Sequence, residues 1–121
     1  LQVGIKGIDI KIYRHQDGFP EIILPIIKDI TKRCLNKNRK NKNEVITNIM
    51  KKFSLLQVKN LLYSKNDNIE PKLTGYEITL NFDKGIEFYY EINILDAIIE
   101  VYEVKRHNDT LNFNLIKRVY I

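Results

Sequence analysis

The sequence predicts an α+β fold with helices in the first half of the chain and an antiparallel sheet in the second half. In residues 21–35, and again from residue 45 to about residue 63, apolar side chains recur every three or four positions, the period of a helix with one buried face. Between residues 76 and 92, apolar and polar side chains alternate as they do in a strand. The chain has 121 residues, of which 44% are hydrophobic. This length and composition are typical of a folded soluble domain, so we expect one domain over residues 1–121.

Residues 3–13 are predicted to form the first strand. Ile8, Ile10 and Ile12 alternate there with polar residues, which indicates a strand with one buried face. A turn is expected at residues 15–20, because Asp-Gly and Pro provide a side-chain acceptor, a permissive backbone and a fixed φ angle. The chain then enters a helical segment.

Residues 21–35 are predicted to form the first helix. Pro25 lies inside this range and lacks a backbone N–H, so we expect the regular helix to begin only near Leu24. Cys34 falls on the apolar stripe, where a thiol is usually buried and inert. The stripe consists of Ile23, Ile26, Ile27, Ile30 and Cys34.

Residues 36–43 contain four cations and no apolar side chain, so we predict a flexible basic loop. Helical spacing resumes at Val45 and continues to about Tyr63. A capping-box pattern at residues 54–57 predicts that this second helix bends or breaks near Phe53.

The clearest strand pattern covers residues 76–82 and 86–92, separated by Asp-Lys-Gly at residues 83–85. Two alternating segments joined by such a turn predict a β-hairpin. The side expected to face the helices consists of Ile78, Leu80, Phe82, Phe88, Tyr90 and Ile92.

Two further strands are predicted at residues 98–105 and 111–120, joined across residues 106–110. The predicted order is therefore one strand, two helices and four strands. Strands that follow helices through short turns favour an antiparallel sheet with the helices on one face. We expect about five strands, including the first, and two or three helices.

Residues 13–21 read Tyr-Arg-His-Gln-Asp-Gly-Phe-Pro-Glu. They resemble a Tyr-x-His-x-Asp-Gly-aromatic-Pro motif in small uncharacterised proteins of phages, archaeal viruses and other prokaryotic mobile elements. Residues 86–92, followed by the Val-Tyr-Glu-Val of residues 101–104, are similar to the end of the same family. The resemblance implies a viral or mobile-element setting, and hence the host cytoplasm, but supplies no catalytic residues.

Composition also favours a cytoplasmic protein that does not enter a membrane. The single cysteine cannot form an intramolecular disulfide, and no apolar run approaches the roughly 20 residues that span a bilayer. The first residues lack the pattern of an export signal. The net charge of +5 divides unevenly: residues 1–65 hold 14 Lys/Arg and 5 Asp/Glu (+9), whereas residues 66–121 hold 6 and 10 (−4). One half is basic and the other acidic.

Two His-x-Asp pairs, His15/Asp17 and His107/Asp109, would supply metal ligands if they met in the fold. The alternative is ordinary turn chemistry, in which aspartate accepts backbone N–H groups. Asp17 in particular could cap the first helix. We prefer the structural interpretation and predict no metal site.

The basic loop suggests a second kind of site. Its four cations could contact phosphates, with salt-sensitive binding, although no nucleic-acid-binding motif and no stacking aromatic accompanies them. The alternative is a solvated charge run. The candidate nucleic-acid-binding residues are Lys37, Arg39, Lys40 and Lys42.

The sheet face opposite the helices suggests a third kind of site, a docking surface for another protein. It is expected to be acidic and aromatic, suited to a basic partner or to a second copy of the chain. The alternative is the polar side of an ordinary sheet. The candidate partner-binding residues are Glu77, Glu87, Tyr89 and Glu91.

No nucleophile elbow, phosphate loop or dinucleotide-binding motif is present, so we predict no catalytic residue and no cofactor. The leading hypothesis is a non-enzymatic protein-interaction module of a virus or mobile element that inhibits or regulates a host system. Its partner would be a protein or a second copy. Nucleic-acid binding through the basic loop is the first alternative, and a metal-dependent enzyme using the two His-x-Asp pairs is the second.

Overall fold

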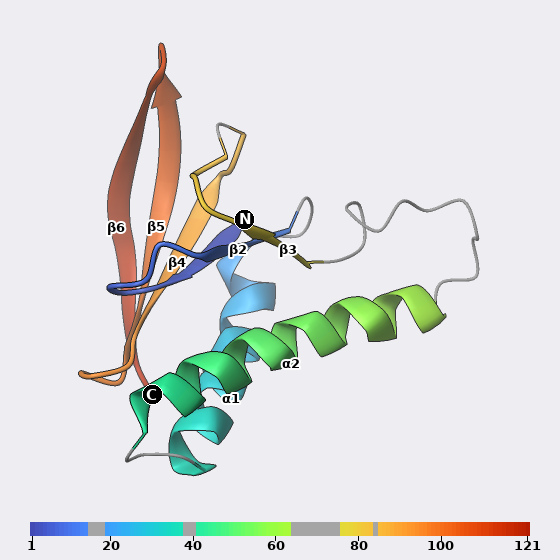
Figure 1. Ribbon diagram of the computed structural model, residues 1–121. Helices are drawn as coiled ribbons and strands as arrows, with labels where there is room; N and C mark the ends of the chain where they lie inside the picture. Colours follow the sequence, from blue (N-terminus) through green and yellow to red (C-terminus); the bar gives the residue numbers. More distant parts are fainter. Residues whose placement is uncertain (15–18, 38–40, 64–75, 84) are drawn as a thin grey trace.

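One mixed β-sheet and two helices make up the part of the chain that the computed structural model describes, residues 1–14, 19–37, 41–63, 76–83 and 85–121 (Figure 1). The sheet has the strand order β3-β2-β1-β4-β5-β6. The α+β class is confirmed, but the sheet is not purely antiparallel, since β1 and β4 run parallel. In chain order the elements are β1 (Gln2–Ile5), β2 (Lys11–Arg14), α1 (Pro20–Lys37), α2 (Lys42–Tyr63), β3 (Tyr76–Thr79), β4 (Phe88–Asn93), β5 (Ile98–His107) and β6 (Thr110–Tyr120).

The predicted first strand is in fact a hairpin of two short strands, which raises the expected five strands to six. The chain reverses after β1 at Gly7, whose φ of 87° is accessible to glycine and costly for other residues. The alternation therefore does not run through the segment: Ile12 is buried opposite Val3, whereas Ile10 is 40% exposed.

The predicted hairpin at residues 76–92 is wrong. β3 pairs with β2 at the sheet edge, β4 pairs with β1 and β5, and the β1–β2 hairpin lies between β3 and β4. The segment that joins β3 to β4 crosses the sheet face opposite the helices, because Phe82 packs there against Tyr89 and Phe113. Leu80 and Phe82 therefore do not face the helices as predicted, and Leu80 is exposed.

Gln2 on β1 anchors this crossing segment. Its side chain is fully buried; Nε2 donates to Thr79 Oγ1 and to the Asn81 carbonyl, and Oε1 accepts from the Asp83 N–H, each at 2.9 Å. A buried amide is stable only when its hydrogen bonds are made, so Gln2 specifies where the segment crosses.

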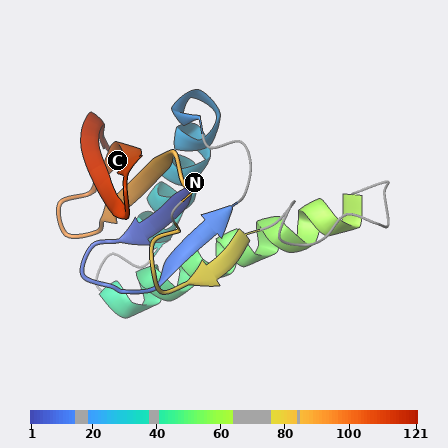
Figure 2. The ribbon, with the colours of Figure 1, turned by 90° about the horizontal axis from the view of Figure 1, so that it is seen from above.

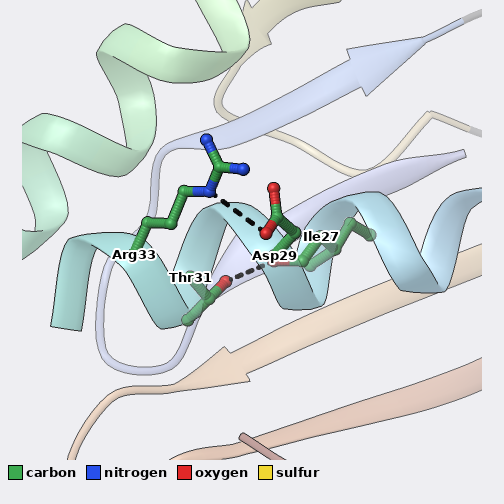
Figure 3. A network of polar contacts seen from close by, with 4 residues as sticks. All are labelled: Ile27, Asp29, Thr31 and Arg33. Carbon is green, nitrogen blue, oxygen red and sulfur yellow. Dashed lines mark hydrogen bonds and ion pairs between the residues drawn. The ribbon is translucent and has the colours of Figure 1, made fainter. Parts of the chain in front are cut away.

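Helix α1 begins at Pro20, earlier than predicted, and includes Pro25. Pro25 is exposed, so water can satisfy the carbonyl that loses its helical partner. The buried stripe was largely predicted, but Ile26 is exposed and Leu24 and Thr31 are buried in addition. The hydroxyl of Thr31 donates to the Ile27 carbonyl at 2.7 Å, which satisfies it inside the core (Figure 3).

Helix α2 is continuous, so the predicted break near Phe53 is wrong. Asn41 caps its start, because the Glu44 N–H donates to Asn41 Oδ1 at 3.2 Å. Helix α1 extends to Lys37 and α2 starts at Lys42, so most of the predicted loop at residues 36–43 that the structure describes is helical. The C-terminal half of α2 extends beyond the sheet (Figures 1 and 2).

The core lies between the helices and one face of the sheet. It joins residues of α1 and α2 to alternate residues of β1, β2, β4 and β5. A smaller cluster, centred on Ile86, Tyr89 and Val104, lies on the opposite face under the crossing segment. In the described parts of the chain, no helix has the length and apolar character needed to cross a bilayer.

Candidate interaction surfaces

β6 forms an exposed edge of the sheet. Its predicted strand is confirmed, and a two-residue turn with Asn108 in the left-handed region joins it to β5. Among the described strands it pairs only with β5, so its outer backbone groups form an edge that another strand can extend. Between the pairs Val101↔Lys117 and Tyr102↔Leu115, the ladder has an extra residue, Ile116. The large apolar residues exposed on β6 are Phe113, Leu115, Ile116 and Tyr120.

Next to β6, on the face opposite the helices, lies a shallow open pocket of about 230 Å³. Four aromatic rings line it together with Glu91. Phe82 packs edge-on against Tyr89 with ring centroids 4.9 Å apart, and lies 4.8 Å from Phe113. The ammonium of Lys11 lies 4.5 Å from the Phe82 centroid, a favourable cation–π distance. The lining rings belong to Phe82, Tyr89, Tyr102 and Phe113.

The tyrosines of this pocket stay protonated at neutral pH. Burial raises the pKa of Tyr89, and the neighbouring Glu91 carboxylate, which accepts a 3.4 Å hydrogen bond from Tyr89 Oη, raises it further. Burial is also the main cause of the raised pKa of Tyr102, followed by Glu100 and then Glu91. The pocket is therefore lined by uncharged rings, which suit contact with an apolar side chain.

The four residues predicted for the acidic face do not share one open surface. Tyr89 is only 6% exposed, because the crossing segment packs over it. Glu91 is half-buried in the pocket, and Glu87 is exposed before β4 begins. Glu77 belongs to β3, which β2 and β1 separate from β4. The predicted separation of Phe82 from Tyr89 onto opposite faces is wrong, since their rings touch.

One predicted His-x-Asp pair lies at the tip of the β5–β6 hairpin. His107 is exposed at the end of β5, and the Asp109 carboxylate lies 3.7 Å from Arg106. His15 and Asp17 fall outside the described residues. Within the described ranges, no group of three or more His, Cys, Asp or Glu side chains is placed to hold a metal ion.

Two of the four cations of the predicted basic loop lie at helix ends. Lys37 ends α1 and Lys42 begins α2, whereas Arg39 and Lys40 lie outside the described residues. A groove of about 310 Å³ between α1 and α2 brings together cations from both helices. We call it the helix groove; its lining residues are Arg33, Cys34, Lys37, Asn48, Lys51 and Lys52.

Sequence reasoning missed the α2 side of this groove. Arg33 and Lys37 are four residues apart on α1, and Asn48 is three and four residues from Lys51 and Lys52 on α2, so each set shares a helix face. That spacing was a usable signal. Which faces meet depends on how the helices pack.

The thiol of Cys34 forms part of the groove floor. Cys34 is buried, as predicted. Burial raises its pKa, and the positive charges of Lys52 and Lys37 oppose that effect only in part. The thiol is therefore protonated at neutral pH and serves as an apolar surface.

No protein-family model matches the sequence, and neither a curated protein nor a solved structure matches it. The candidate surfaces therefore rest on the geometry of this chain. They are the β6 edge with its adjoining aromatic pocket, and the helix groove.

Proposed function

We propose that this chain is a non-enzymatic protein-interaction module that binds an extended segment of a partner protein along β6. The observation that carries the proposal is the 11-residue edge strand β6. Its outer backbone groups pair with no other described strand, and it exposes large apolar side chains. Strand addition to a sheet edge is a common mode of peptide recognition, in which backbone hydrogen bonds supply affinity and side-chain pockets supply specificity.

Both the pocket and the charge of β6 indicate the chemistry of the partner. The aromatic pocket beside Phe113 would accept an apolar side chain of the added strand. β6 carries two cations and no acidic residue. Arg118 is ion-paired with Glu100 of β5 at 3.0 Å, so Lys117 is the cation that favours an acidic residue in an otherwise apolar partner segment. Two antiparallel copies of β6 would bring together strands that both carry cations, which makes a heterologous partner the better fit.

The resemblance of residues 13–21 to a motif of phage and archaeal-virus proteins supports a mobile-element setting. In that setting, a small module without a catalytic motif acts by occupying a surface of a host protein. The proposed role is therefore inhibition or regulation of a host system.

The test is selection of binders from a displayed random-peptide library, followed by affinity measurement on matched variants. Leu115→Asp places a charge on the exposed β6 surface, where the parent side chain is 48% exposed, so folding should not depend on it. Leu95→Asp makes the same change in the β4–β5 turn, where the side chain is 80% exposed. We expect selected acidic–apolar peptides to lose at least about tenfold in affinity for Leu115→Asp, as for an interface contact worth more than 1 kcal/mol.

Leu95→Asp should bind these peptides like the parent protein. Equal losses in the two variants, or peptides that bind both as tightly as the parent, would reject the β6 edge as the docking surface. A concentration-dependent dimer in sedimentation that Leu115→Asp abolishes would assign the edge to a second copy and overturn the heterologous partner.

A further inference from the structure

We propose that the helix groove binds phosphate groups of a nucleic-acid backbone. The groove lies between α1 and α2, and its lining combines four cationic side chains with one amide and one protonated thiol. It is independent of the β6 edge, because the helices pack on the opposite face of the sheet from the aromatic pocket.

The cations reach the groove from both walls. Arg33 and Lys37 come from the last turns of α1, and Lys51 and Lys52 come from the middle of α2. Lys51 and Lys52 are exposed, so their ammonium groups can approach a ligand without the cost of burying a charge. Phosphate contacts from lysine act as point charges and do not demand a fixed geometry.

Arg33 is ion-paired with an acidic side chain of its own helix. Arg33 Nε donates to Asp29 Oδ1 at 3.1 Å, and both side chains are largely exposed (Figure 3). An exposed pair of this kind is worth little, and the guanidinium carries four further N–H donors beyond Nε. Arg33 can therefore contact a phosphate while it keeps its ion pair.

The charge of the whole helical region favours a long polyanion over a small one. Residues 20–63 contain ten Lys/Arg and three Asp/Glu, a net charge of +7. A nucleic-acid backbone presents a regular row of negative charges, and each neutralised phosphate releases counterions. Asn48 adds an amide that can donate to phosphate or sugar oxygens, and the Cys34 thiol leaves an apolar floor against which a sugar can lie.

The experiment measures fluorescence anisotropy of a labelled single-stranded oligonucleotide and of a duplex over a series of salt concentrations. The groove variant is Lys51→Gln/Lys52→Gln. The matched control, Lys105→Gln/Lys117→Gln, removes two exposed charges from β5 and β6. We expect the groove variant to lose about tenfold in affinity near 0.15 M salt. For single strands, the slope of log affinity against log salt concentration should become shallower by roughly 1.4, because two phosphate contacts are lost.

The control variant should stay within about twofold of the parent protein. Equal losses in the two double variants would show that only net charge matters and would overturn the site. Absence of oligonucleotide binding at 0.15 M salt would also overturn it. If a nucleoside diphosphate bound as tightly as the oligonucleotide and displaced it, the ligand would be a small phosphorylated molecule and the nucleic-acid assignment would fail.

Leu115→Asp provides the link to the proposed function. It should weaken peptide binding and leave oligonucleotide binding unchanged, because Leu115 lies on β6 and does not line the groove. Loss of both activities in Leu115→Asp would contradict two independent surfaces. Failure of either proposal can therefore be recognised separately.

Discussion

Replacing Gly4 by alanine tests the packing that supports the aromatic pocket. Gly4 lies on β1 beside Tyr89, and its missing side chain makes room for the phenol. A Cβ at this position would overlap Tyr89 Oη and would lie 3.1 Å from both Cε2 and Cζ of the ring. Normal carbon–carbon contacts are about 3.5–4.0 Å, so the ring would have to move.

The expected cost follows from how firmly Tyr89 is held. Its centroid lies 4.9 Å from that of Phe82, 5.8 Å from that of Phe113 and 6.0 Å from that of Tyr102. Overpacking of a close-packed site costs about 1–3 kcal/mol, and replacing glycine in a strand returns about 0.5–1 kcal/mol. We expect Gly4→Ala to lower the free energy of unfolding by about 1–2 kcal/mol.

Urea denaturation followed by circular dichroism measures this change, which corresponds to a midpoint lower by roughly 0.5–1 M. Tyr89→Phe removes the overlapping hydroxyl, so the double variant should be less destabilised than the two single changes added together, with a coupling above about 0.5 kcal/mol. Gly85→Ala is the control, because the described atom that a Cβ there would approach is the carboxylate at the end of the Asp83 side chain, at 3.3 Å. A Gly4→Ala protein as stable as the parent, or purely additive effects, would refute the packing argument.

Two further predictions concern side chains of β1 and β4. Gln2→Leu should lower the free energy of unfolding by about 2–4 kcal/mol, because the backbone groups of Asn81 and Asp83 lose their buried partner. Hydrogen exchange at the Asp83 amide should become faster for the same reason. Unchanged exchange would contradict the anchoring role of Gln2. The pKa values of Tyr89 and Tyr90 are raised, so above pH 10 the folded state keeps protons that the unfolded state releases. The free energy of unfolding should therefore be unaffected by these two tyrosines below pH 10 and should fall as the pH rises further. Urea denaturation between pH 8 and about pH 11 should show a loss of at most about 1.4 kcal/mol per pH unit for each tyrosine, and Tyr89→Phe should remove one such contribution; the same slope in that variant would contradict the assignment.

The elements that the sequence predicted well are those whose signals are local. The helical stripe from Ile23 to Cys34 and the turn that joins β5 to β6 depend on spacing and turn chemistry within a few residues. The helix boundaries were less predictable. Pro25 is accepted inside α1 because its face is exposed, and α1 and α2 use most of the described basic segment as helix ends.

The candidate surfaces were only partly predictable for the same reason. Composition identified cations near the end of α1, but the partners of Lys37 in the helix groove, Lys51 and Lys52, are brought there by helix packing. Alternation identified Tyr89 as lying off the helix-facing side of β4, but it could not show that Phe82 covers it.

By itself, the sequence determined the fold class, most of the helical and strand segments and the uneven distribution of charge, because periodicity and composition act over short stretches of chain. Only the tertiary structure decided which strands are neighbours. Alternation specifies which face of a strand is buried, and it carries no information about the adjacent strand. The β1–β2 hairpin lies between β3 and β4 because its apolar residues complete the core and because Gln2 binds the crossing segment, contacts between residues about 80 positions apart.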